Sequence, residues 1–271
     1  MLNPEGVMKV SRWVGITLAV SLFSFTAQAA MYWSPAPAKH GHGGHDRHAP
    51  KVFVLSEGAG AELALITPKP NQIPLQAEQG RVTIKPTGMD NYHALVATRD
   101  QGKGHESAIR YVYMNNKPSG ESPSDIMAYE KSVLEIEPAP YAREHWRYYS
   151  NTEAVFVLRF KGKPLANTTV LLNTANGTIE QLQSDGEGVL TVLLPEDFSA
   201  IKAGRMGNRP SEFVLTLSHS EGEQVFTTTL SSDYHINPEH WQSTPLGLLT
   251  VLGGMALGGF ITVRRRRRKE K

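Results

Sequence analysis

Short apolar runs of strand length fill most of this sequence, and each run ends in a cluster of turn-forming residues. In residues 51–150 the runs are KVFVLS, AELALI, RVTIKP, YHALVATR, AIRYVYMN and SVLEIEP. No stretch of this block sustains a helical hydrophobic period for three turns, and runs of this length between Gly, Pro, Asn and Asp are typical of β-strands. The first block therefore predicts an all-β domain.

A second block, residues 151–240, repeats the pattern with AVFVLRF, TTVLLNT, TIEQLQS, GVLTVLL, EFVLTLS and QVFTTTL. Asn176-Gly177 is the sequence signature of a type I′ hairpin turn, and residues 185–188 form a tight glycine-containing turn. The carboxylates of that second turn also suggest calcium, but the ligand spacing of an EF-hand loop is missing. We therefore expect an all-β fold of two tandem β-sandwich-like domains, over residues 51–150 and 151–240.

The first 29 residues have the features of a secretory signal peptide. Lys9 and Arg12 precede an apolar run over residues 13–25, and Ala27-Gln28-Ala29 supplies the small-residue pattern of a cleavage site. Cleavage after this pattern exports the rest of the chain, whereas an uncleaved N-terminal anchor is the alternative. We predict a signal peptide over residues 1–29.

The other end of the chain carries a candidate membrane-spanning segment. Residues 245–263 contain no charge, and five consecutive arginines from Arg264 follow directly. Nineteen helical residues span about 28 Å, close to the hydrocarbon thickness of a bilayer. Because basic clusters flank membrane helices on the cytoplasmic side, we expect one transmembrane helix and a cytoplasmic tail over residues 264–271.

The composition limits the cellular compartment and the classes of binding partner that we expect. The chain has no cysteine, so its domains stand without disulfides and any metal site lacks thiolate ligands. The net charge is +2, but seven of the 28 basic residues lie in the C-terminal tail, and the exported body is mildly acidic. Basic residues that are confined to the flank of a membrane helix do not indicate nucleic-acid binding. We predict a single-pass protein of a bacterial inner membrane with its body in the periplasm.

Residues 160–196, FKGKPLANTTVLLNTANGTIEQLQSDGEGVLTVLLPE, have a recognisable order of strands and turns. The segment resembles the transthyretin-like or carboxypeptidase-regulatory-like sandwich, and more narrowly the periplasmic accessory components of cobalt and nickel uptake systems. That resemblance implies a signal peptide, β domains, a C-terminal membrane helix and membrane subunits of a metal transporter as partners. It is clearest over residues 152–235 and weaker over residues 51–150.

Four of the ten histidines lie in one ten-residue tract, KHGHGGHDRH, over residues 39–48. The surrounding residues 30–50 are rich in Pro, Ala, Gly and His without periodicity, which predicts a disordered arm. Neutral imidazole suits nickel, cobalt, copper and zinc, and glycines let several rings approach one ion. The family that the chain resembles usually has a short histidine signature just after the cleavage site, and the tract matches it by composition alone. The predicted metal ligands are His40, His42, His45 and His48, and a polar linker is the alternative.

The other sequence motifs are less informative about function. Glu-His-Trp occurs twice, at residues 144–146 and 239–241, either as a mark of related domains or by coincidence. The motifs H-E-x-x-H and G-x-S-x-G, a P-loop and a cysteine nucleophile are all missing from the sequence, so we do not expect an enzyme. Gly254 and Gly258 form a G-x-x-x-G pattern that suits helix packing in a homodimer or against a transporter subunit.

Two functional hypotheses follow from the sequence. In the first, the histidine arm captures a divalent transition metal, nickel or cobalt by resemblance, and delivers it to a membrane transport system. In the second, the sandwiches form a structural or interaction module that binds protein or glycan in the envelope. Copper or zinc buffering is a variant of the first hypothesis, because imidazole ligands alone prefer Cu²⁺ over Ni²⁺.

Overall fold

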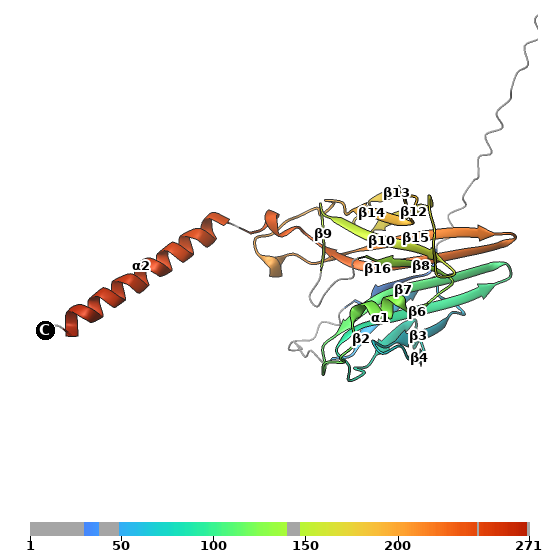
Figure 1. Cartoon of the computed structure of the whole chain (residues 1–271), viewed down its shortest axis with the longest axis horizontal. Coiled ribbons are helices and arrows are strands. Elements are labelled where there is room, and N and C mark those ends of the chain that lie inside the picture. The colour runs from blue at the N-terminus through green and yellow to red at the C-terminus, as the bar shows by residue number, and fades with distance from the viewer. Residues whose placement is uncertain (1–29, 38–48, 140–146, 243, 270–271) are drawn as a thin grey trace, which may run out of the picture.

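The computed structural model describes residues 30–37, 49–139, 147–242 and 244–269. Apart from two helices and two short 3₁₀ turns, its regular elements are β-strands, so the all-β prediction is confirmed. The signal-peptide prediction and the four tract histidines lie outside the described residues. In Figure 1 the strands form an elongated body, and the C-terminal helix α2 (Thr244–Lys269) extends away from one end of it.

The N-terminal sandwich packs a three-stranded antiparallel sheet on a four-stranded one. The first sheet has the order β1-β2-β5, and the second has the order β4-β3-β6-β7. Their bounds are β1 Tyr32–Pro35, β2 Lys51–Ser56, β3 Glu62–Ile66, β4 Gln72–Leu75, β5 Arg81–Ile84, β6 Asn91–Gln101 and β7 Gly104–Met114. Trp33 is fully buried in the core between the two sheets, and its indole N–H donates to the carbonyl of Ala108 at 3.1 Å.

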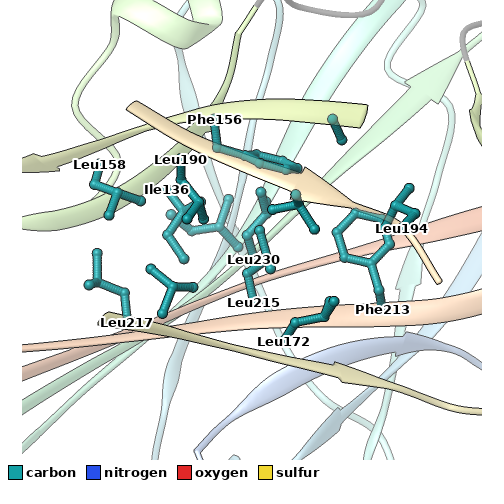
Figure 2. Close-up of a cluster of buried hydrophobic side chains, with 14 of the residues drawn as sticks. Ile136, Phe156, Leu158, Leu172, Leu190, Leu194, Phe213, Leu215, Leu217 and Leu230 are labelled. Carbon is teal, nitrogen blue, oxygen red and sulfur yellow. The ribbon is translucent and has the colours of Figure 1, made fainter. Parts of the chain in front are cut away.

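The C-terminal sandwich packs β8, β10, β11 and β14 on β13-β12-β15-β16. Their bounds are β8 Leu134–Pro138, β10 Glu153–Phe160, β11 Lys163–Pro164, β12 Thr169–Thr174, β13 Ile179–Gln183, β14 Val189–Leu193, β15 Ser211–Glu221 and β16 Gln224–His235. Alternate residues of β10, β12 and β15 face inward, because successive side chains of a strand point to opposite faces. Figure 2 shows side chains of both layers, including Phe156 and Leu217, pointing into one apolar core.

The two sandwiches share one sheet. Strands β7 and β16 pair in parallel from Gly104–Val225 to Ile109–Leu230, and this pairing joins both halves into a nine-stranded sheet. Ile109 belongs to the C-terminal core, whereas its neighbour Ala108 belongs to the N-terminal core. Because successive side chains of a strand point to opposite faces, the two covering layers lie on opposite faces of the shared sheet.

Helix α1 (Pro123–Ala128) explains why β6 is buried on both faces. Ile126 and Met127 of α1 pack on Ala94 and Val96 of β6, on the face opposite the β1-β2-β5 layer. A strand covered on both faces has a nearly continuous apolar run in place of an alternating one. This accounts for the run YHALVATR in the first block.

Two boundaries differ from the sequence expectation. Tyr32–Pro35 forms β1 within residues 30–50, where the composition predicts disorder, because this strand pairs with β2 and its Trp33 is buried against the shared sheet. Strand β8 lies before residue 150, yet it pairs with β10 of the C-terminal sandwich. The chain therefore enters the second sandwich earlier than its composition indicates.

Helix α2 follows the body after a short connection. The 3₁₀ turn η2 (Pro238–His240) is held to the body because the Asn237 N–H donates to the Ser150 hydroxyl at 3.1 Å and His240 lies 2.7 Å from Glu196. Within α2, residues Gly247–Arg266 have a mean hydropathy of 1.5 and are exposed, and the segment is long and apolar enough to cross a membrane.

Candidate functional site

A fork opens where the two sandwiches diverge. Beyond the Ile109–Leu230 pair, β7 stays with β6, whereas β16 pairs in parallel with β9 (Tyr148–Tyr149). A cavity of about 220 Å³ lies between the separated strands. Its lining, which we call the fork, is Tyr92, Arg110, Tyr111, Tyr113, Pro138, Arg147, Tyr148, Leu230, Ser231, Ser232, Asp233 and His235.

Two cations hold the fork at its vertex. Arg110 of β7 is 4% exposed, and its guanidinium donates to Asp233 at 2.7 Å and to Glu212 at 3.0 Å. The Lys51 ammonium donates to the carbonyl of Tyr113 at 2.6 Å, where β7 no longer has β16 as a neighbour. Burial lowers the pKa of Lys51, and the nearby Asp233 opposes that shift. These bonds pair the Tyr113 carbonyl and the carboxylates of Glu212 and Asp233, at the point where β7 and β16 no longer bond to each other.

The walls of the fork are aromatic. Tyr92 and Tyr113 meet edge to face with ring centroids 5.0 Å apart, and the Tyr113 hydroxyl donates to Asp90 at 3.0 Å. Tyr148 packs edge to face on Phe213 at 5.3 Å. Burial raises the pKa of Tyr148, so its phenol stays protonated at neutral pH. The rings are therefore rigid and present apolar faces beside hydroxyl groups.

The fork combines aromatic faces with polar side chains, a combination that suits ligand binding. Flat aromatic faces lie beside Arg147, Asp233 and His235, which offer donors and an acceptor. Small-molecule sites commonly occur at domain interfaces and combine apolar walls with a few polar groups. The fork has both features.

A larger groove, of about 970 Å³, runs beside β3 and β4. Its lining is rich in glycine and alanine, and Tyr129 lies at its rim with 36% exposure. Lys131, the basic residue of the lining, donates to the carbonyls of Ile126 and Met127 at 3.1 and 3.2 Å, so it terminates α1. The groove is larger than the fork, but its lining contains fewer aromatic residues.

The predicted metal ligands His40, His42, His45 and His48 belong to the connection between β1 and β2. The described residues on both sides of this connection pair with each other, from Tyr32–Ser56 to Pro35–Phe53. The Ala36 N–H donates to the Val52 carbonyl at 2.9 Å. The tract is therefore anchored at both ends. Within the described residues no group of three or more His, Asp or Glu side chains could hold a metal ion.

The histidines of the described strands have structural partners. His93 is fully buried, and its ring lies 2.7 Å from the Thr87 hydroxyl and 3.1 Å from the Asn91 carbonyl. His105 lies 2.5 Å from Asp100, and the ring of His219 packs on that of Phe160 at 4.4 Å. These contacts account for His93, His105 and His219 without a metal.

Comparisons with known proteins give no family. No family model matches the sequence, and no curated protein matches it. One similar solved structure concerns host cell surface retention of a 1.5-MDa bacterial ice-binding adhesin. The identity is 12% over 70% of this chain and 59% of that one, and the TM-score is 0.24. Another is the glucan-utilisation protein SGBP-B of Bacteroides ovatus, with 11% identity over 73% of this chain and 44% of that one and a TM-score of 0.17. At these TM-scores neither likeness supports an inference about this chain.

The sequence analysis missed the fork. Four of the nine tyrosines line it, and the dipeptide Arg-Tyr occurs on both sides, at Arg110-Tyr111 and Arg147-Tyr148. Arg-Tyr pairs in strands are a visible pattern, but only the parallel pairing of β7 with β16 brings these two together. That pairing joins segments more than a hundred residues apart.

Proposed function

We propose that this protein is a membrane-anchored binding module of the bacterial envelope and that the fork is its ligand site. The single observation that supports the proposal is the tyrosine-lined cavity between the two sandwiches. The shared sheet makes the site rigid, because the walls from β6, β7, β9 and β16 belong to one hydrogen-bonded layer. A preorganised site loses less conformational entropy when a ligand binds.

The proposed ligand is a glycan of which one sugar ring enters the fork. Drug-sized ligands occupy about 300–1,000 Å³, so a cavity of about 220 Å³ suits one ring better than a whole oligosaccharide. A sugar ring has an apolar face that packs on tyrosine and hydroxyl groups that bond to Arg147, Asp233 and His235. The mixed charges of the fork favour a neutral ligand.

A glycan panel tests the site. Wild-type protein is expected to bind one glycan class and to melt at higher temperature in its presence, because a ligand of the native state stabilises by mass action. Arg147→Ala should weaken binding about tenfold, since one hydrogen bond to a polar ligand contributes about 1–1.5 kcal/mol. Arg81→Ala, an exposed arginine on β5, is the matched control and should bind normally. Equal loss in both variants, or no binding by wild type, contradicts the proposal.

The proposed topology places the body in the periplasm. The support is the apolar segment Gly247–Arg266 with its C-terminal arginines, together with the signal-peptide pattern in residues 1–29. Protease added to spheroplasts should digest the body and leave only the region of the tail. A body that survives this treatment contradicts the topology.

Metal capture by the histidine tract is a second candidate function, with nickel or cobalt as the metal and a membrane transporter as the partner. The observation that favours it is the anchoring of the tract between β1 and β2. Ordering a free chain costs roughly 1–2 kcal/mol per residue, and a connection with both ends held has part of that cost already met. The tract therefore suits a metal better than a free arm does.

Calorimetry with Ni²⁺ tests the second candidate. Changing His40, His42, His45 and His48 to alanine should abolish most binding and leave the melting temperature of the metal-free protein unchanged. Binding should weaken more than tenfold per pH unit below about 6.5, because several imidazoles must lose protons. Changing His219 to alanine is the control. A four-alanine variant that binds as tightly as wild type removes the tract from consideration.

We also propose that Gly254 and Gly258 allow close packing of α2 against a second membrane helix. Both positions lie in open space on α2, and glycines four residues apart share one face. Cross-linking in membranes should decrease when both are changed to leucine. Unchanged cross-linking excludes this face.

A further inference from the structure

The connection between β14 and β15 lies at the membrane-proximal end of the body. Glu196, near its start, pairs with His240 of η2 at 2.7 Å, and Ser211, at its end, is the register partner of Tyr234. In Figure 1 this gold-coloured connection lies at the end from which α2 leaves. The span begins at Gly247, five residues after Gln242, which corresponds to at most about 18 Å of extended chain. This end of the body is therefore held close to the bilayer surface.

Residues 199–210, SAIKAGRMGNRP, form what we call the basic loop. Met206 is 86% exposed and Ile201 is 42% exposed. Lys202 and Arg209 are exposed, and Arg205 is a third cation in the segment. There is no acidic residue between Asp197 and Glu212. Exposed apolar residues beside cations are the combination that binds the interface of an anionic membrane.

The basic loop has its own hydrogen bonds. The Asn208 side chain accepts from the Lys202 N–H at 2.8 Å and donates to the carbonyls of Lys202 and Gly204 at 2.7 and 2.9 Å. These three bonds close the loop around one side chain. The exposure of Met206 is therefore held by the fold of the loop, and a preordered loop meets a surface at lower entropic cost.

The acidic groups around the loop are mostly engaged. Asp197 accepts from the hydroxyls of Thr174, Thr178 and Tyr234, and Glu196 pairs with His240. Glu239 of η2 and Glu153 at the start of β10, the register partner of Leu193, are exposed acids at this end of the described body. The basic loop itself contains three basic residues and no acidic one, so the loop is positive.

We infer that the basic loop docks on anionic phospholipid headgroups of the membrane in which α2 is anchored, with Met206 and Ile201 inserted at the interface. This inference rests on the proposed membrane anchoring. Two contacts, α2 and the basic loop, would then set the orientation of the body above the bilayer. The Debye length of about 10 Å at 0.1 M salt makes the ionic part of this contact sensitive to salt.

The natural absence of cysteine allows a single-site probe in the full-length chain. Met206→Cys, labelled with an environment-sensitive dye, is reconstituted in nanodiscs of phosphatidylcholine with and without phosphatidylglycerol. Ser220→Cys, exposed at the opposite end of β15, is the matched control. We expect a blue shift and several-fold stronger quenching by lipid-attached quenchers at position 206 than at position 220, only with phosphatidylglycerol.

The double change Lys202→Glu with Arg209→Glu should abolish that difference, and 1 M salt should reduce it. A probe at position 206 that stays aqueous, in protein that co-purifies with the discs, overturns the inference and leaves the anchoring intact. Protein that does not enter the discs overturns both. A blue shift equal in both lipid compositions, and unchanged by the double variant, identifies a protein surface in place of lipid and also overturns the inference.

Discussion

His93 makes the N-terminal sandwich sensitive to acid. Its ring is fully buried, the Asn91 carbonyl accepts from the Nδ1–H at 3.1 Å, and Nε2 accepts from the Thr87 hydroxyl at 2.7 Å. Burial, with a smaller contribution from the positive charge of Lys51, lowers the pKa of His93 from 6.5 to about 4. Protonation would place a charge in the core and deprive Thr87 of its acceptor.

The sign and size of the effect follow from linkage. Because the folded pKa lies below the unfolded one, the unfolded chain binds more protons between pH 6.5 and 4. The stabilisation by neutral His93 is present above pH 6.5 and is lost as the pH falls towards 4. The difference between pKa values of 6.5 and about 4, at 1.36 kcal/mol per pH unit, gives roughly 3 kcal/mol in total, of which about 2 kcal/mol is lost between pH 7 and 4.5.

Denaturant unfolding at pH 7 and 4.5, monitored by the fluorescence of buried Trp33, measures this loss in wild type and in His93→Gln. The variant should be less stable at pH 7 but should lose about 2 kcal/mol less on acidification. Burial raises the pKa of Glu135 and Glu212, which act with the opposite sign. Their effect is common to both proteins and cancels in the difference. Equal losses in wild type and variant would refute the reasoning.

Two further predictions concern Arg110 and the turn at Gly188. Arg110→Ala leaves Glu212 and Asp233 without their shared cation and should cost roughly 2–4 kcal/mol of unfolding free energy by denaturant titration, since the carboxylates are partly exposed; a cost under about 1 kcal/mol contradicts this role. Gly188→Ala should cost several kcal/mol in the same assay, because φ is +79° and a Cβ would lie 2.9 Å from the backbone nitrogen of Leu165. Gly186→Ala, where a Cβ meets nothing within 4 Å, is the control and should change stability by less than about 1 kcal/mol.

The sequence predicted the local elements better than their assembly. The apolar runs AVFVLRF and EFVLTLS, predicted as strands, form β10 and β15 of the structure. The hairpin at Asn176-Gly177 is present, but the type I′ prediction is wrong, because only Gly177 has positive φ. Asn176 instead donates to Asp197 and to the Tyr234 hydroxyl. Tertiary hydrogen bonds have overridden the local preference.

The missed features depend on contacts distant in sequence. Strand β1 is four residues in a segment rich in proline and alanine, and it is ordered because Trp33 enters a core made by later strands. The parallel pairing of β7 with β16 leaves no periodicity in either strand. The fork exists only because that pairing stops at Ile109–Leu230. Local patterns cannot specify where two distant strands separate.

The shared sheet also decides how the protein carries mechanical load. Tension along α2 would enter the body through η2 at the C-terminal end of β16, and a load on the N-terminal sandwich at Gly104 would pull the opposite end of β7. Since β7 and β16 are parallel, the pull runs along the strands and loads their hydrogen bonds together in shear, whereas a perpendicular pull would break them one at a time. The junction between the sandwiches should then resist tension, and other parts of the chain should unfold before it separates.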